Sequence, residues 1–343
     1  MSDGQTRWDG GSTPRTAMGG ISRTPWAGSF QQEFTAAVTA VSQVVRGKGE
    51  EVELALTAVF GGGHLLVEDV PGVGKTLLAR CLAAAIGGTF HRIQGTPDLL
   101  PSDVTGTEII DPESGRLEFR EGPVFANVVL ADELNRMSPK TQSALLEVME
   151  EGTVSVGTRE PFRMPDPFVV VATQNPADYE STYTLPDAQL DRFMIRLSLG
   201  YPDLDAEIEM LRDHTGKRPE PLCQPILRER LEYYREQCQT AVYVENNVYR
   251  YIAELVTATR RQVGLARGAS PRAGVALMRA AQVRAAASGR TAVKVDDVQE
   301  MAEPVLAHRL VPEADLLDSY DAAEAVRLAL RNVATPSATG SWR

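Results

Sequence analysis

The spacing of apolar residues along the chain shows two different patterns. From residue 30 to 60 the apolar residues recur at helical spacing, and an interruption at residues 46–49 indicates two helices joined by a loop. Short apolar runs bounded by turn residues then alternate with helical segments. These runs occupy residues 64–67, 90–93, 128–131, 168–173 and 193–199. Runs of this length, separated by helices, predict the buried parallel strands of an α/β sheet.

The strand signal ends after Tyr201-Pro202, and helical spacing continues to about residue 334. Ser270 and Pro271, followed by an apolar face, are typical of a helix N-cap and first helical position. We therefore predict an α/β domain over residues 29–201 and a smaller, all-helical domain over residues 202–334. Residues 1–28 and 335–343 are predicted to be polar tails, the first with too little apolar surface to offset the entropy of ordering.

Charge and composition indicate which kinds of binding partner the protein is not expected to have. The chain has 35 basic and 46 acidic residues, and the resulting formal charge of −11 disfavours a grip on nucleic acid or on an anionic membrane. No stretch approaches the ~18 apolar residues of a membrane span, and no signal-peptide pattern is present, so we expect a cytoplasmic protein. Cys81, Cys223 and Cys238 are too scattered for a disulfide framework, which favours structural thiols.

The strongest chemical signal lies between the first predicted strand and the helix after it. This strand–loop–helix context, with Gly72, Gly74, Lys75 and Thr76, is typical of a polyphosphate site. Loop and helix N–H groups would bind phosphate, and the two glycines would let the backbone turn and approach closely. Lys75 would reach the β- and γ-phosphates, and the Thr76 hydroxyl would ligate Mg²⁺. The strict pattern has glycine where this chain has Asp69.

We therefore predict ATP and Mg²⁺ as ligands of this loop. The predicted contacts are Val70, Pro71, Gly72, Val73, Gly74, Lys75, Thr76 and Leu77.

Two later strand ends carry further candidates. The strand at residues 128–131 is followed by Asp132 and Glu133. A carboxylate at a strand's carboxyl end can face the nucleotide in an open α/β sheet, so Asp132 would hold the Mg²⁺ hydration shell. Glu133 would orient and deprotonate the attacking water. Asn175 follows another strand and could hydrogen-bond the γ-phosphate or the water, although an Asn-Pro step alone is more typical of a turn.

Hydrolysis also requires positive charge where negative charge develops on the γ-phosphate. The candidates are Arg192, just before the last predicted strand, and Arg272, in the first turn of a helix of the second domain. Spacing alone gives the alternative, a surface salt-bridge residue, about equal weight at each position.

Taken together, five motifs resemble those of the MoxR family of AAA+ ATPases over about residues 34–310. They are residues 68–76, 130–136, 172–176, 190–193 and 269–273. The resemblance implies that Lys75 and Thr76 are the Walker A pair and that Asp132 and Glu133 are the Walker B pair. It also implies that Asn175 is sensor 1, Arg192 the arginine finger and Arg272 sensor 2, without deciding whether Arg272 acts in its own subunit.

The same resemblance implies a parallel sheet of order 5-1-4-3-2, a C-terminal helical lid, and a homo-oligomeric ring, usually a hexamer, with ATP at its subunit interfaces. Two positions depart from the family pattern. Gly47 lies in Arg46-Gly47-Lys48, where relatives often carry Val-Gly-Gln near the adenine, and is a candidate nucleotide contact. Gly95 stands where an aromatic residue is common.

Two segments exceed a minimal nucleotide domain. Residues 108–120 and 153–164 each indicate a β-hairpin. By resemblance these are the helix-2 insert and the pre-sensor-1 hairpin, which approach the central face of the ring. Surface decoration is the alternative.

The functional prediction is an ATP-hydrolysing ring motor that remodels or matures a protein client. Resemblance adds a client with a von Willebrand factor A domain, whose identity the sequence does not give. One alternative is a magnesium-chelatase-type AAA+ subunit, and another is a nucleotide-gated scaffold without turnover. A DNA-dependent motor is disfavoured by the net charge of −11.

Overall fold

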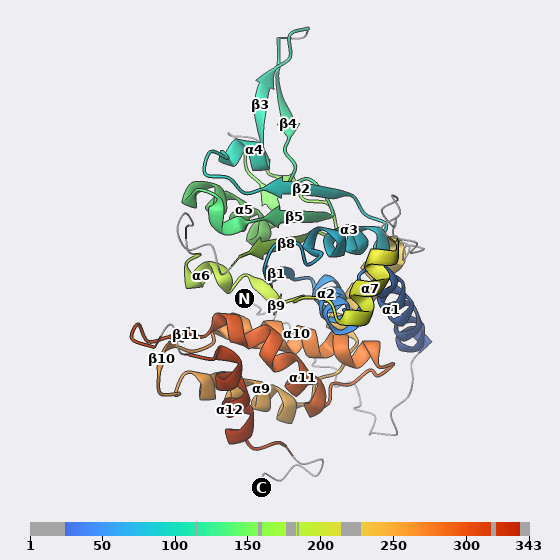
Figure 1. The fold of residues 1–343 in the computed structure, drawn as a ribbon, viewed down its shortest axis with the longest axis vertical. Coiled ribbons are helices and arrows are strands. Elements are labelled where there is room, and N and C mark those ends of the chain that lie inside the picture. The colour runs from blue at the N-terminus through green and yellow to red at the C-terminus, as the bar shows by residue number, and fades with distance from the viewer. Residues whose placement is uncertain are drawn as a thin grey trace, which may run out of the picture.

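A computed structural model describes residues 25–113, 115–156, 160–175, 183, 185–213, 228–316 and 320–336. Its centre is a five-stranded sheet (Figure 1) made of β1 (His64–Glu68), β2 (Phe90–Gln94), β5 (Val128–Asp132), β8 (Val169–Gln174) and β9 (Phe193–Leu197). The strands are all parallel and lie in the order β2-β5-β8-β1-β9. Numbered within the sheet and counted from the β9 edge, this is the order 5-1-4-3-2.

The inner strands are covered on both faces, which explains why β1, β5 and β8 are continuous apolar runs, whereas the edge strand β2 is largely exposed. Alternate residues of a strand point to opposite faces. Leu65 therefore packs into a core with α1 (Pro25–Val44), α2 (Gly49–Gly61) and α3 (Lys75–Ala85). Leu66 packs into a second core that includes residues of α4 (Pro101–Thr105) and α5 (Pro139–Glu151). The predicted α/β class is confirmed.

The chain after the sheet forms a helical lid beside the β9 edge (Figure 1). Helix α7 (Leu204–Asp213) lies beside α1 and α2 of the sheet domain (Figure 1). The helices of the lid are α8 (Arg228–Thr240), α9 (Asn246–Thr259), α10 (Pro271–Ala287), α11 (Val295–Leu306) and α12 (Ala322–Asn332). Ser270 caps α10 as predicted, because its hydroxyl accepts a hydrogen bond from the Ala273 N–H at 3.2 Å. Helix α10 packs against α2, so the lid and the sheet domain share one apolar core.

The predicted helical lid is confirmed, and it also contains one short pair of strands. Strands β10 (Leu265–Arg267) and β11 (Val311–Pro312) form a short antiparallel pair. Strands of three and two residues are too short to leave an alternating apolar pattern in the sequence.

Both predicted hairpins are present. Strands β3 (Gly106–Ile110) and β4 (Leu117–Glu121) form the first, which projects from the end of the molecule opposite the lid (Figure 1). Strands β6 (Thr153–Val154) and β7 (Phe162–Arg163) form the second. The rings of Phe119 and Phe162 stack with centroids 4.3 Å apart, so the two hairpins contact each other.

The N-terminal boundary lies earlier than predicted. Helix α1 begins at Pro25, and Ala27 and Phe30 are fully buried against the core. The predicted tail therefore ends before residue 25, because these side chains lie at helical spacing on one buried face. The rest of that tail, and residues 337–343 of the other, lie outside the described residues.

Two of the three cysteines lie in the described part of the chain. Cys81 and Cys238 are buried, and burial raises the pKa of Cys238 to about 12, so both fit the structural role predicted for them. Cys223 lies outside the described residues. Among the helices of the described segments, none is both long and apolar enough to cross a membrane.

Candidate nucleotide site

The candidate phosphate loop, residues 69–74, connects β1 to α3. Gly72 and Gly74 adopt φ angles of +89° and +99°, a region that residues with a side chain rarely occupy. No heavy atom lies within 4 Å of the position that a Cβ would take at either glycine. Backbone conformation, rather than crowding, therefore requires glycine here, and the space beside the loop is open.

Helix α3 begins directly at the loop. Its N-cap is Gly74, so no side chain caps the first turn. The first N–H groups of a helix lack partners within the helix, and together with the helix dipole they attract anions. Lys75 is the first helical residue, and its ammonium donates a hydrogen bond to the Asp69 carbonyl at 2.8 Å. The loop thus holds a cation and uncapped N–H groups together.

Asp69, the departure from the strict pattern, has a structural task. Its side chain is buried, and Oδ2 accepts hydrogen bonds from the Leu199 N–H, from the Gly200 N–H at 2.8 Å and from the Ser198 hydroxyl at 3.2 Å. Its Oδ1 accepts from the Val70 N–H at 3.2 Å. The carboxylate therefore ties the phosphate loop to the segment that leaves β9 for the lid.

The same segment approaches Gly47. A Cβ on Gly47, whose φ is +69°, would lie 3.4 Å from the Ala206 Cβ and 3.5 Å from an Asp203 carboxylate oxygen. The neighbouring Lys48 donates to the Tyr201 carbonyl at 3.1 Å. The loop between α1 and α2 therefore lies against the start of α7, although a nucleotide contact at Gly47 stays a prediction.

Asp132 ends β5, and its carboxylate has two partners. Oδ1 accepts from the Thr173 hydroxyl at 2.6 Å, and Oδ2 pairs with Arg92 of β2 at 2.6 Å. Thr173 also accepts from the Glu133 N–H at 2.8 Å, so strands β5 and β8 are linked at their carboxyl ends.

Glu133 follows with φ +54°, the only residue other than glycine with positive φ in the described segments. Its Oε2 accepts hydrogen bonds from the Gln94 amide at 3.1 Å and from Arg136 at 2.9 Å. Gly95 lies so close that a Cβ there would be 2.2 Å from the Glu133 carbonyl oxygen. In this backbone an aromatic residue at position 95 would therefore require the end of β5 to shift.

Asn175 is buried and follows β8 directly, at the edge where β1 and β5 also end. Parallel strands deliver their carboxyl ends to one edge of a sheet. The structure therefore brings Lys75, Thr76, Asp132, Glu133 and Asn175 to the same edge, as the motifs predict.

Arg192 and Arg272 lie elsewhere. Arg192 precedes β9, whose Phe193 pairs with His64 at the start of β1, whereas the phosphate loop follows the end of β1. Five residues of strand, about 16 Å, separate those two ends. Arg192 and Arg272 both pair with Glu150 of α5, at 2.7 Å and 2.5 Å, so the structure joins them to each other and not to Lys75.

The two arginines stabilise the anionic form of the carboxylate between them. The hydrogen bond from Arg272, together with the charge of Arg192, holds the pKa of Glu150 below its ordinary value. The hollow beside it has a volume of about 340 Å³ and is lined by Arg192, Arg272 and Arg279 among others. Four guanidinium groups, which include that of Arg309, and two carboxylates, Glu150 and Asp191, line this hollow, so its charged groups are positive on balance.

The sequence motifs did not include the residues that bind the predicted site residues, namely Arg92, Gln94 and Glu150. Arg92 and Gln94 are exposed on one face of β2 while Ile93 is buried, so the polar alternation was a readable signal. Glu150 gives no comparable signal, since a glutamate near a helix end is usually solvated.

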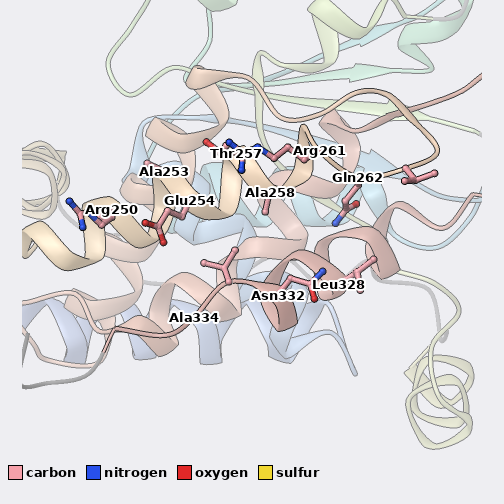
Figure 2. Close-up of a pocket in the computed structure, with 12 residues that line it drawn as sticks. Arg250, Ala253, Glu254, Thr257, Ala258, Arg261, Gln262, Leu328, Asn332 and Ala334 are labelled. Atoms are coloured by element: carbon pink, nitrogen blue, oxygen red, sulfur yellow. The ribbon is translucent and has the colours of Figure 1, made fainter. Parts of the chain in front are cut away.

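Another pocket is unrelated to these motifs. It has a volume of about 820 Å³ and lies between α9 and α12 (Figure 2), with Arg250, Glu254, Arg261 and Asn332 among its lining residues. None of the predicted site residues borders it.

The fold and the site define a nucleotide-binding P-loop protein of the AAA class. Residues 64–195 match the family described as "ATPase family associated with various cellular activities (AAA)", and residues 257–330 match the AAA lid domain. A solved structure of a Cytophaga hutchinsonii protein, proposed to be an ATPase, superposes with a TM-score of 0.83 at 36% identity, covering 90% of this chain and 96% of that one.

Two relatives indicate which family within the AAA class the chain resembles. The chaperone MoxR1 of Mycobacterium tuberculosis is 42% identical over 88% of this chain and 81% of its own length. The uncharacterised protein YeaC of Bacillus subtilis is 46% identical over 81% of this chain and 87% of its own length. The chain belongs to the MoxR family of AAA+ ATPases.

Proposed function

We propose that the protein hydrolyses ATP with Mg²⁺ at the subunit interfaces of a homo-oligomeric ring, a hexamer by family resemblance. Each active site would have two halves. One subunit would supply the phosphate loop and the carboxylates at the adjacent strand ends, and its neighbour would supply the arginines.

The residues at the first half fit a magnesium nucleotide. The glycines leave open space beside uncapped N–H groups, and an amine, a hydroxyl and two carboxylates lie at the same sheet edge. Mg²⁺, near Thr76 and Asp132, would neutralise phosphate charge when bound. Loop N–H groups and Lys75 would bind phosphate, and Asn175 would orient the γ-phosphate or the water.

Glu133 would act as the base that orients and deprotonates the attacking water. Gln94 and Arg136 both donate to Oε2 of Glu133 in this structure. These two donors orient the carboxylate, and the proton of the water would pass to its other oxygen, Oε1.

The observation that carries the second half is the place of the arginine pair. Arg192 and Arg272 meet at Glu150, at the end of the sheet opposite the phosphate loop of their own chain. Neither is placed to reach a nucleotide on Lys75 of the same subunit. We infer that both act in trans, where fixed guanidinium groups would stabilise charge on the neighbour's γ-phosphate.

We further propose that hydrolysis serves a chaperone-like function on a protein client with a von Willebrand factor A domain. The named function of the MoxR1 relative supports the chaperone part. The projecting β3–β4 hairpin exposes Ile110 and Leu117 and offers an apolar contact for a client (Figure 1). Affinity capture with Glu133→Gln tests this proposal, because rings stalled with ATP should retain the client. Equal capture by Lys75→Ala would contradict it.

The alternatives have weaker support. The similarity to MoxR1 spans both domains, which favours the MoxR-type role over a magnesium-chelatase-type subunit. A scaffold without turnover would not need Glu133, so phosphate release separates it from the proposal. Lys75→Ala should abolish nucleotide binding, whereas Glu133→Gln should bind ATP and stop turnover, since Glu133 acts on water only during reaction.

The trans site is tested by mixing two inactive variants. Arg192→Ala should bind ATP and hydrolyse it about 10³-fold more slowly, as for other arginine fingers. Mixing it with Lys75→Ala creates interfaces that pair an intact phosphate loop with an intact Arg192, so partial activity should return. No recovery at any ratio, when a pull-down of differently tagged chains shows that subunits exchange, would overturn the trans assignment.

A further inference from the structure

One carboxylate connects the lid to the residue beside Arg192. Asp191 Oδ1 pairs with Arg309 at 2.8 Å, and Oδ2 accepts a hydrogen bond from the Ser270 hydroxyl at 2.7 Å. Arg309, in the 3₁₀ helix η2 (Ala307–Arg309), also donates to the Phe193 carbonyl at 2.6 Å. Both partners of Asp191 belong to the lid, whereas Asp191 lies between α6 (Asp187–Leu190) and β9 of the sheet domain.

The junction is buried. The Arg309 side chain is only 3% exposed, and that of Asp191 is 16% exposed. The imidazole of His308 lies beside Arg309 and is also held to the Phe193 carbonyl, at 2.9 Å. Burial and the adjacent guanidinium keep the pKa of His308 well below its ordinary value, so Asp191 is the counter-ion that Arg309 has here.

This junction adjoins both arginines of the proposed trans site. Asp191 is the residue before Arg192, and Ser270 lies two residues before Arg272 in the cap of α10. Arg192 and Arg272 then converge on Glu150. The segments that carry Arg192 and Arg272 are therefore linked twice. Asp191 links them through its hydrogen bond with Ser270, and Glu150 links them through the two guanidinium groups.

Stability alone is a weak reason for such a pair. The cost of desolvating a buried ion pair often exceeds the attraction between its charges, and setting a register is a better attested role. The lid already packs on the sheet domain through the apolar core between α2 and α10. What the ion pair adds is a directional constraint, because a guanidinium bound to a carboxylate and a carbonyl has one orientation.

We propose that the Asp191–Arg309 pair is the register element that sets Arg272 of the lid against Arg192 of the sheet domain, so that both approach the neighbour's terminal phosphate as one unit. Asp191 and Arg309 are thus positioning residues, which act through the two arginines. This inference rests on the proposed trans site.

The expected effect follows from geometry. Asp191→Asn keeps the shape of the side chain and an acceptor oxygen, but it removes the charge that fixes Arg309. A shift of Arg272 relative to Arg192 by about 1 Å should slow turnover about 100-fold, the usual consequence of misplacing a catalytic group. ATP affinity should change far less than turnover, because the phosphate loop with Lys75 lies at the opposite end of the sheet. Turnover therefore falls about 100-fold, while the affinity for a fluorescent ATP analogue stays within about threefold of the wild-type value.

The matched control is another ion pair between the sheet domain and the lid. Glu53 of α2 pairs with Arg284 of α10, away from the trans arginines. Glu53→Gln removes one charge from this pair, as Asp191→Asn does from the other, and should leave turnover within about twofold of wild type. Arg309→Lys is the second variant if Asp191→Asn does not fold. It keeps the charge but loses the fork that reaches both Asp191 and Phe193, so it should also be slow.

The decisive readout is the direction of complementation. Asp191→Asn should regain activity when mixed with Lys75→Ala, which contributes an intact Asp191 and Arg192, and should gain nothing with Arg192→Ala. A merely destabilised chain would lose ATP binding together with turnover. The inference is overturned if Asp191→Asn turns over like wild type, if Glu53→Gln is equally slow, or if Lys75→Ala rescues Arg192→Ala but not Asp191→Asn. If Lys75→Ala fails to rescue Arg192→Ala as well, the proposed trans site itself fails.

Discussion

Replacing Asp69 with glycine would restore the residue that the strict phosphate-loop pattern carries at this position, yet we predict that it destabilises the protein. The Asp69 carboxylate accepts hydrogen bonds from two backbone N–H groups and one hydroxyl in residues 198–200, and from the Val70 N–H. Glycine has no acceptor to offer them. The N–H groups of Leu199 and Gly200 would be left without this partner in a buried or partly buried place.

The magnitude can be worked from these contacts. Hydrogen bonds to a charged group contribute about 1.5–3 kcal/mol each, and they are not additive when they share one carboxylate. Water can reach part of the segment, because Gly200 is only partly buried. We therefore expect the free energy of unfolding to fall by about 3 kcal/mol, which corresponds to a drop in Tm of about 4 °C for a protein of this size.

Thermal and urea unfolding of Asp69→Gly, Asp69→Ala and Asp69→Asn would measure this effect. Asp69→Ala removes the acceptor without adding glycine's backbone entropy, which accounts for about 0.5–1 kcal/mol. Asp69→Asn keeps one acceptor oxygen and should lie between Asp69→Ala and wild type. If Asp69→Gly unfolds at the wild-type temperature, the carboxylate does not hold residues 198–200 to the loop in solution and the reasoning is refuted.

Two further predictions concern charged side chains. Arg92 pairs with Asp132, and because the Arg92 side chain is 48% exposed, the pair is worth about 1 kcal/mol. If Arg92 competes with Mg²⁺ for this carboxylate, Arg92→Met should lower the Mg²⁺ concentration for half-maximal activity about fivefold. An unchanged concentration would contradict this competition. Burial lowers the pKa of His64 from 6.5 to about 4, and lowers that of His308 as well. As the pH falls, the histidines are therefore protonated in the unfolded chain before they are protonated in the folded one. The free energy of unfolding should thus be highest above pH 6.5 and should fall between pH 6.5 and pH 4, by about 3 kcal/mol from His64 alone. Denaturant unfolding across this range should show a flatter profile for His64→Gln than for wild type.

The elements that could be predicted from the sequence are those encoded locally. Strands β1, β5 and β8 are apolar runs bounded by turns and are buried on both faces, so these runs stand out. The phosphate loop is also local, because Gly72, Gly74 and Lys75 act through the backbone and the helix that they join. Periodicity and turn chemistry were sufficient for both.

What the sequence did not reveal depends on contacts between distant residues. Asp69 binds residues about 130 positions later, and Arg272 meets Glu150 about 120 positions earlier, so no local pattern marks either contact. Asp69 reads as a departure from a motif until its partners are seen. Arg192 and Arg272 had equal weight as surface residues until their common partner and their distance from the phosphate loop were known.

The division of the site between two sheet ends leads to a last prediction, on assembly. If ATP is held by the loop of one subunit and contacted by Arg192 and Arg272 of the next, it binds the assembled state more tightly than the free subunit, and it must promote assembly by that difference. Sedimentation of Glu133→Gln with Mg·ATP should therefore show a ring at micromolar protein, which loosens when nucleotide is removed. Lys75→Ala should not respond to ATP. Arg192→Ala should bind ATP and assemble less, because the ligand loses the contact that distinguishes the two states. If Glu133→Gln stays a strict monomer at saturating ATP, Arg192 and Arg272 have no neighbouring phosphate to bind, and the two-subunit site is refuted.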